Sequence, residues 1–119
     1  MIKINVKTSS HKYFRQLLEL LGSFDPFSSM RSREKDVFAI LLRSNWLLKS
    51  KSKAYRDEYL LSREHRVYMA TELKISDINL NMIISSLRKR GVIVDNSIDA
   101  KYEFKPIKEL TFNFEEERK

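Results

Sequence analysis

Two segments near the ends of the chain alternate apolar and polar residues with a period of two. In residues 2 to 6, Ile2, Ile4 and Val6 share one side of an extended chain, which is the pattern of a strand. Residues 107 to 114 repeat this pattern, with Leu110, Phe112 and Phe114 on one side. We expect two strand-like arms, paired with each other inside the monomer or added to the sheet of a neighbouring molecule.

Between the arms, the apolar positions recur at steps of three and four, which predicts helices. The first helix spans residues 11 to 21, with Ser9 or Ser10 as its N-cap and Gly22 ending it in the left-handed conformation. Residues 23 to 29 contain Pro26 and predict a loop. We expect its two phenylalanines, Phe24 and Phe27, to dock on the core.

The next helix, from Ser32 to about residue 49, carries apolar residues around so much of its circumference that it must lie centrally in the fold. Ser32 is its expected N-cap, and Glu34 and Asp36 lie favourably in its first turn. A charged connection follows, and residues 54 to 61 predict a further turn or two of helix.

Residues 62 to 91 predict two helices joined by a short turn. Ser62 and Ser76 are their expected N-caps, and Gly91 ends the second. The expected inward positions are Val67, Met69, Ala70 and Leu73 on the first helix, and Leu80, Ile83, Ile84 and Leu87 on the second.

This pair of helices resembles a winged helix-turn-helix. Ala70 stands where that family has a small residue at the crossing of the helices, and the surrounding apolar offsets are filled by Met69, Leu73, Ile75, Leu80 and Ile83. Residues 85 to 94, read Ser-Ser-Leu-Arg-Lys-Arg-Gly-Val-Ile-Val, resemble the passage from recognition helix to first wing strand. Lys74 departs from the glycine that the turn often carries.

The resemblance covers residues 62 to 104, with the 32 to 49 helix as the family's first helix. It implies that the second helix of the pair enters the major groove of DNA. It also implies a wing from Val92 to Val94, a turn through Asp95, Asn96 and Ser97, and a return strand within residues 98 to 104.

Charge favours a polyanionic partner for this body. The chain has 23 Lys and Arg against 16 Asp and Glu, and the excess is +6 in residues 1 to 61, +3 in residues 62 to 91 and −2 in the remainder. A basic body with an acidic tail suits nucleic acid, although solvated surfaces share the signal.

The outward face of the second helix supplies most of the candidate contacts. Asparagine amides read adenine edges, and Arg88 or Lys89 suits phosphate or guanine. Ile78 and Met82 suit thymine methyl groups or a protein partner, whereas Asp77 opposes phosphate. The candidate nucleic-acid-binding residues on this helix are Ser76, Asn79, Asn81, Met82, Ser85, Arg88 and Lys89.

Four further candidates lie outside that helix. Lys49, Lys51 and Lys53 form a basic run suited to phosphates, and Lys101 lies in the expected return strand of the wing. For the run, and for a second run from Arg31 to Lys35, a solvated surface is the competing interpretation. The acidic residues of the wing make it a poor partner for DNA.

The sequence offers little for catalysis or metal binding. It has no cysteine, so disulfides and thiol chemistry are excluded, and its two histidines are too few for the usual zinc sites. We expect His65 to be a neutral histidine at the surface or at a helix cap, with no catalytic neighbour. We therefore expect no enzyme activity, no cofactor and no metal. No apolar run approaches the roughly twenty residues needed to cross a membrane, so we expect a cytoplasmic protein.

These observations predict a mainly α fold with a small β component. Residues 1 to 31 form an N-terminal strand, short helix and loop; residues 32 to 106 form a winged helix-turn-helix core, tri-helical with a β-hairpin; residues 107 to 119 form a C-terminal strand-like arm and acidic tail. The expected function is binding of double-stranded DNA in transcription or replication control.

The whole chain also resembles small proteins encoded by large tailed phages. The alternative function is accordingly a virion or assembly protein at a connector, neck or capsid, which forms a homo-oligomer or larger assembly through residues 1 to 7 and 107 to 114.

Overall fold

The computed structural model describes residues 2–5, 11–102 and 109–112 of the chain. The described residues form five α-helices, two short 3-10 turns and two antiparallel strand pairs: β1 (Ile2–Asn5), α1 (His11–Leu20), η1 (Phe27–Ser29), α2 (Ser32–Leu47), α3 (Lys53–Leu60), α4 (Arg63–Leu73), α5 (Asp77–Lys89), β2 (Ile93–Val94), β3 (Ser97–Ile98), η2 (Ala100–Tyr102) and β4 (Glu109–Phe112). The predicted mainly helical fold with a small β component is confirmed.

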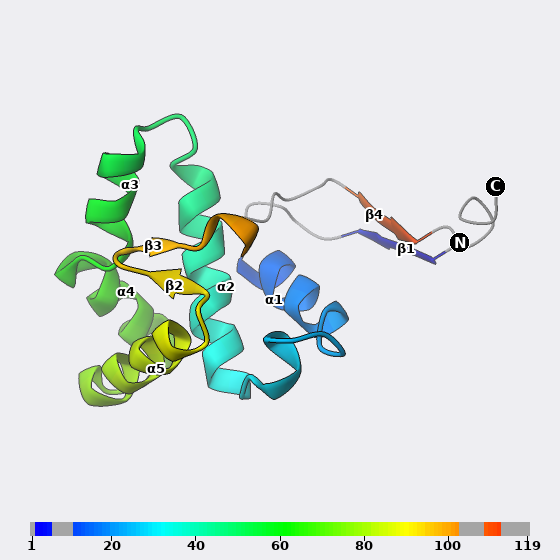
Figure 1. Ribbon diagram of the computed structural model, residues 1–119, viewed down its shortest axis with the longest axis horizontal. Helices are drawn as coiled ribbons and strands as arrows, with labels where there is room; N and C mark the ends of the chain where they lie inside the picture. The colour runs from blue at the N-terminus through cyan, green and yellow to red at the C-terminus, as the bar shows by residue number, and fades with distance from the viewer. Residues whose placement is uncertain (1, 6–10, 103–108, 113–119) are drawn as a thin grey trace.

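Helix α2 is the centre of the fold, as its broad apolar surface predicted. Figure 1 shows α1 on one side of it and α3, α4 and α5 on the other. All residues from Val37 to Leu42 are buried, because neighbouring elements cover successive faces of this helix. The burial of six consecutive side chains explains why no amphipathic stripe marks this segment.

Serine caps define the starts of the next three helices. The hydroxyls of Ser52, Ser62 and Ser76 accept hydrogen bonds from the backbone N–H groups three residues on, at 3.2, 3.2 and 3.1 Å. The predictions for Ser62 and Ser76 are thus confirmed. Each cap satisfies a backbone donor that the first helical turn leaves without an intrahelical partner.

The turn between α4 and α5 is three residues long, and it depends on Lys74 in the left-handed region at φ 56°. This conformation allows the N–H of Ile75 to donate to the carbonyl of Ala70 at 3.0 Å. At the other end of α5, Gly91 takes φ 81° and ends the helix as predicted. The chain then leaves α5 directly into β2.

Three local predictions are wrong. Gly22 is not in the left-handed region. The N–H of Leu21 still donates to the carbonyl of Leu17, as in a helix, and the chain then turns without a positive φ at Gly22. Arg31, not Ser32, is the N-cap of α2. Phe27 is buried as expected, but Phe24 is 63% exposed. The N-cap predicted at Ser9 or Ser10 lies outside the described residues.

One inward position of α4 is also wrong. Val67 is 52% exposed, whereas His65 is buried together with Met69 and Ala70, with Leu73 half-buried. At 100° per residue, Val67 lies about 200° around the helix from Met69, so the two side chains cannot face the same core. The inward stripe of α4 therefore begins at His65.

The strands form two separate sheets. In the hairpin, Ile93 pairs with Ile98 and Val94 with Ser97, so the turn contains Asp95 and Asn96 alone, and the expected three-residue turn is too long. β1 and β4 pair antiparallel within the chain, with Ile2 opposite Phe112. This confirms strands in the described parts of both predicted arms and, of the two alternatives, pairing inside the monomer. Val6, Ile107 and Phe114 of the predicted arms lie outside the described residues.

Candidate nucleic-acid interface

Helix α5 presents a continuous ridge to solvent. Ile78, Met82, Ser85 and Lys89 follow one another at steps of four, three and four residues and are all exposed, so they lie along one line of the helix surface. Ile78 is 72% exposed and Met82 is 65% exposed. The opposite side of α5 is held in the core by Leu80, Ile84 and Leu87. One side of α5 is therefore packed in the core, and the opposite side is exposed to solvent.

Arginines border this ridge on the side of α2. A groove of about 680 Å³ runs between the start of α2 and α5, and Arg31 and Arg33 line it opposite Asn79 and Met82. Both arginines are exposed. They belong to the second basic run of the sequence, and only the packing of α2 against α5 distinguishes them from other surface cations.

Arginines also border the ridge on the side of α4. Arg63 and Arg66 line a pocket of about 320 Å³ together with Asp77 and Asn81. Arg66 Nη1 donates to Asn81 Oδ1 at 3.4 Å. Neither arginine is among the residues predicted from the sequence, although both lie near the start of the predicted helix that precedes α5.

A partly buried ion pair links α5 to α2. Arg90, which caps α5, donates from Nε and Nη2 to the two carboxylate oxygens of Glu34 at 2.9 and 3.0 Å. Glu34, 4% exposed, also accepts from the N–H of Arg31 at 2.9 Å and from the hydroxyl of Ser86. Ser86 is thus turned toward α2.

These contacts determine the charge state of Glu34. Burial alone would raise the pKa of its carboxyl, but the hydrogen bonds from Arg90, Arg31 and Ser86 and the charge of Arg90 outweigh it and lower the pKa from 4.5 to about 2. Glu34 is therefore ionised at neutral pH. The pair links the start of α2, which carries the groove arginines, to the end of α5.

Arg88 donates hydrogen bonds to the turn of the β2–β3 hairpin. Its Nη2 donates to the carbonyl of Asp95 at 3.2 Å and to Asn96 Oδ1 at 3.4 Å, and its Nε donates to the same carbonyl at 3.4 Å. Asn96 lies in a pocket with Arg66, Asn81 and Ser85. The β2–β3 turn therefore lies against the α4 side of the ridge.

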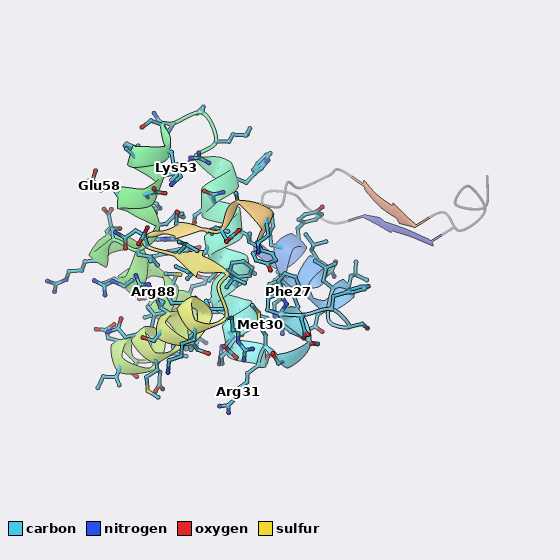
Figure 2. The ribbon with its side chains drawn as sticks, viewed as in Figure 1. Phe27, Met30, Arg31, Lys53, Glu58 and Arg88 are labelled. Carbon is cyan, nitrogen blue, oxygen red and sulfur yellow. The ribbon has the colours of Figure 1, made fainter. Side chains whose placement is uncertain are left out.

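The other predicted site residues divide into two groups. One group lies on α5 and is exposed: Asn79, Asn81, Met82, Ser85 and Lys89. Ser76 precedes this helix and uses its hydroxyl as the N-cap. The second group lies outside α5: Lys49, Lys51, Lys53 and Lys101. Figure 2 shows Lys53 in the upper part of the helical body and Arg31 at its bottom, as expected from the roughly 24 Å length of α2.

The lysines outside α5 have partners of their own. The ammonium of Lys49 lies 3.7 Å from the centre of the Trp46 ring, and that of Lys51 lies 5.6 Å from the Tyr55 ring. Lys53 pairs with Asp57 at 2.7 Å, and Lys101 lies 5.6 Å from the ring of Tyr102. The structure does not bring this basic run to the α5 ridge.

His65 is buried, so its predicted surface position is wrong. It is 1% exposed and lies between the rings of Tyr59 and Tyr68, at 4.7 and 5.9 Å. Its Nδ1 is 2.8 Å from the carbonyl of Leu60, and its Nε2 is 2.9 Å from Ser44 Oγ. Since a carbonyl only accepts, Nδ1 carries the proton in the neutral ring and Nε2 accepts from the serine.

Burial lowers the pKa of His65, and the charge of Arg43 lowers it further, against the opposing hydrogen bond to Leu60. The expectation of a neutral ring agrees with this direction. The Ser44 hydroxyl, which sequence reasoning missed as a neighbour, satisfies the second ring nitrogen. The cluster ties α2, α3 and α4 together.

Over the described part of the chain, no group of three or more histidine or acidic side chains is placed to hold a metal ion. In the same residues, none of the helices combines the length and apolar character required to cross a bilayer. Comparison with protein-family models, with curated proteins and with solved structures finds no match to this chain.

Proposed function

We propose that this protein binds double-stranded DNA as a winged helix-turn-helix, with α5 in the major groove, and acts in transcription or replication control. The observation that carries the proposal is the exposed α5 ridge with arginines along both of its sides. In this reading, α2, α4 and α5 are the three helices of the core, and the β2–β3 hairpin is a short wing.

The charge arrangement suits the shape of the major groove. That groove is about 12 Å wide, so it admits one helix and places a phosphate backbone on each side of it. Arg31 and Arg33 lie on one side of α5, and Arg63 and Arg66 lie on the other. Contacts of this kind position a protein on DNA, and base edges then meet the residues of the ridge.

The experiment is a salt series of duplex binding with two charge-matched variants. The logarithm of the affinity should fall linearly with the logarithm of salt concentration, by about 0.9 for each phosphate contacted. Arg31→Gln with Arg33→Gln should make the slope shallower by about 1.8. Lys49→Gln with Lys51→Gln removes the same charge from the far end of α2 and should leave the slope unchanged.

Two results would reject the proposal. One is the lack of measurable binding to duplex DNA at about 50 mM salt, where phosphate contacts are strongest. The other is an equal change of slope in both double variants, because this would show attraction by overall charge with no defined face.

A second candidate function, the virion or assembly protein, is favoured by the exposure of Ile78 and Met82. Two large apolar side chains one turn apart suit a protein interface. Against assembly through the arms, the described β1 and β4 already pair with each other. Light scattering of the purified protein tests this candidate. The protein should form an oligomer, and the double variant Ile78→Ser, Met82→Ser should dissociate it.

A further inference from the structure

We propose that α5 selects A·T base pairs, with Ile78 and Met82 packed against thymine methyl groups and the amides of Asn79 and Asn81 bonded to adenine. The inference rests on the proposed binding of duplex DNA, and it specifies the class of sequence that the α5 ridge reads.

The first step is the apolar part of the ridge. Ile78 and Met82 are the most exposed large hydrophobic side chains of α5, and the four-residue step between them spans about 6 Å along the helix axis. The C5-methyl group of thymine is the apolar group that base edges present in the major groove. A ridge that begins with isoleucine and methionine therefore complements thymine.

The second step is the position of the amides. Asn79 lies toward α2 and Asn81 toward α4, so the two amides flank the apolar ridge. The hydrogen bond from Arg66 to Asn81 Oδ1 orients that amide. Its NH₂ group is then available to donate to adenine N7, and its oxygen keeps a second lone pair for the adenine amino group.

The third step is the lack of guanine-reading groups on the first turns of α5 itself, since the arginines beside it on α2 and α4 are the ones assigned to phosphates. Guanine is read mainly by arginine or lysine, and no such residue occurs between Lys74 and Arg88 in the sequence. Arg88 is bonded to the hairpin turn, and Lys89 lies eleven residues beyond Ile78. Asp77, whose carboxylate suits cytosine, instead lines the pocket with Arg63 and Arg66.

The test compares duplexes of equal length and charge. The probes are a 20-base-pair duplex of mixed A·T sequence, the same duplex with deoxyuridine for every thymidine, and a G·C duplex, each measured by fluorescence anisotropy at one salt concentration. Removing the methyl groups should weaken binding about fourfold or more, from the burial of one methyl group. The G·C duplex should bind at least about fivefold more weakly than the A·T duplex.

Variants assign the discrimination to the ridge. Ile78→Ala with Met82→Ala should bind the thymidine and deoxyuridine duplexes equally. The matched control is Leu47→Ala, which truncates an exposed leucine of α2 and should keep the full preference for thymidine.

The outcomes separate this inference from the function on which it rests. Salt-dependent binding with equal affinity for all three duplexes overturns the A·T preference and leaves DNA binding in place. Retention of the thymidine preference in the Ile78→Ala, Met82→Ala variant also overturns it. A lack of binding to every duplex removes both proposals together.

Discussion

The Glu34–Arg90 pair allows a quantitative prediction, because Gln at position 34 imitates the protonated acid. The pKa of Glu34 is lowered from 4.5 to about 2. At 1.36 kcal/mol for each pKa unit, the charged form contributes about 3 kcal/mol at neutral pH. Glu34→Gln should therefore lower the free energy of unfolding by about 3 kcal/mol at pH 7, measured by urea denaturation.

The sign of the pH dependence follows from the lowered pKa. The unfolded chain takes up a proton at Glu34 near pH 4.5, whereas the folded protein resists it until about pH 2. The contribution is therefore complete above pH 4.5 and is lost as the pH falls toward 2. Wild type and Glu34→Gln should differ most at pH 7 and converge near pH 2.

The control is Glu58→Gln, which removes the same charge from an exposed position on α3. It should change the stability by less than about 0.5 kcal/mol. The reasoning is refuted if Glu34→Gln costs less than about 1 kcal/mol at pH 7, or if its difference from wild type is the same at pH 7 and pH 3.

Three further predictions concern the turns and the buried histidine. Lys74→Gly should raise the free energy of unfolding by about 0.5 kcal/mol, since glycine adopts φ 56° without steric cost; an equal loss in urea denaturation would contradict this. Gly91→Ala should lower the free energy of unfolding by about 1 kcal/mol, because a φ of 81° is strained for alanine even though the added Cβ would meet no atom within 4 Å. An unchanged thermal midpoint would contradict this prediction. The lowered pKa of His65 means that the unfolded chain takes up its proton first, so stability should fall as the pH drops below about 6.5, a dependence that His65→Gln should remove.

Local signals in the sequence were sufficient for most of the helices. Ser62, Ser76 and Gly91 act through groups within three or four residues of themselves, so a cap or a stop can be read without knowledge of the fold. The strand pairing of the arms was one of two stated alternatives, and alternation alone cannot choose between them.

The remaining features depend on contacts between distant segments. The burial of His65 requires the carbonyl of Leu60 and the hydroxyl of Ser44, which lies 21 residues away. The place of Arg31 beside α5 depends on the packing of α2, and so does the separation of the lysine run from α5. The exposure of Val67 does not depend on distant contacts, since helical periodicity alone would have placed this side chain on the solvent side of α4.

The Arg88 guanidinium connects the last turn of α5 to the tip of the hairpin. A phosphate that attracted this group would draw it from Asp95 and Asn96, so engagement of the anion and support of the tip compete for the same donors. If α5 binds a polyanion as proposed, occupancy of its face would therefore be coupled to the support of the hairpin tip by Arg88. Replacing Arg88 should therefore remove these hydrogen bonds from the hairpin turn even where no ligand is present.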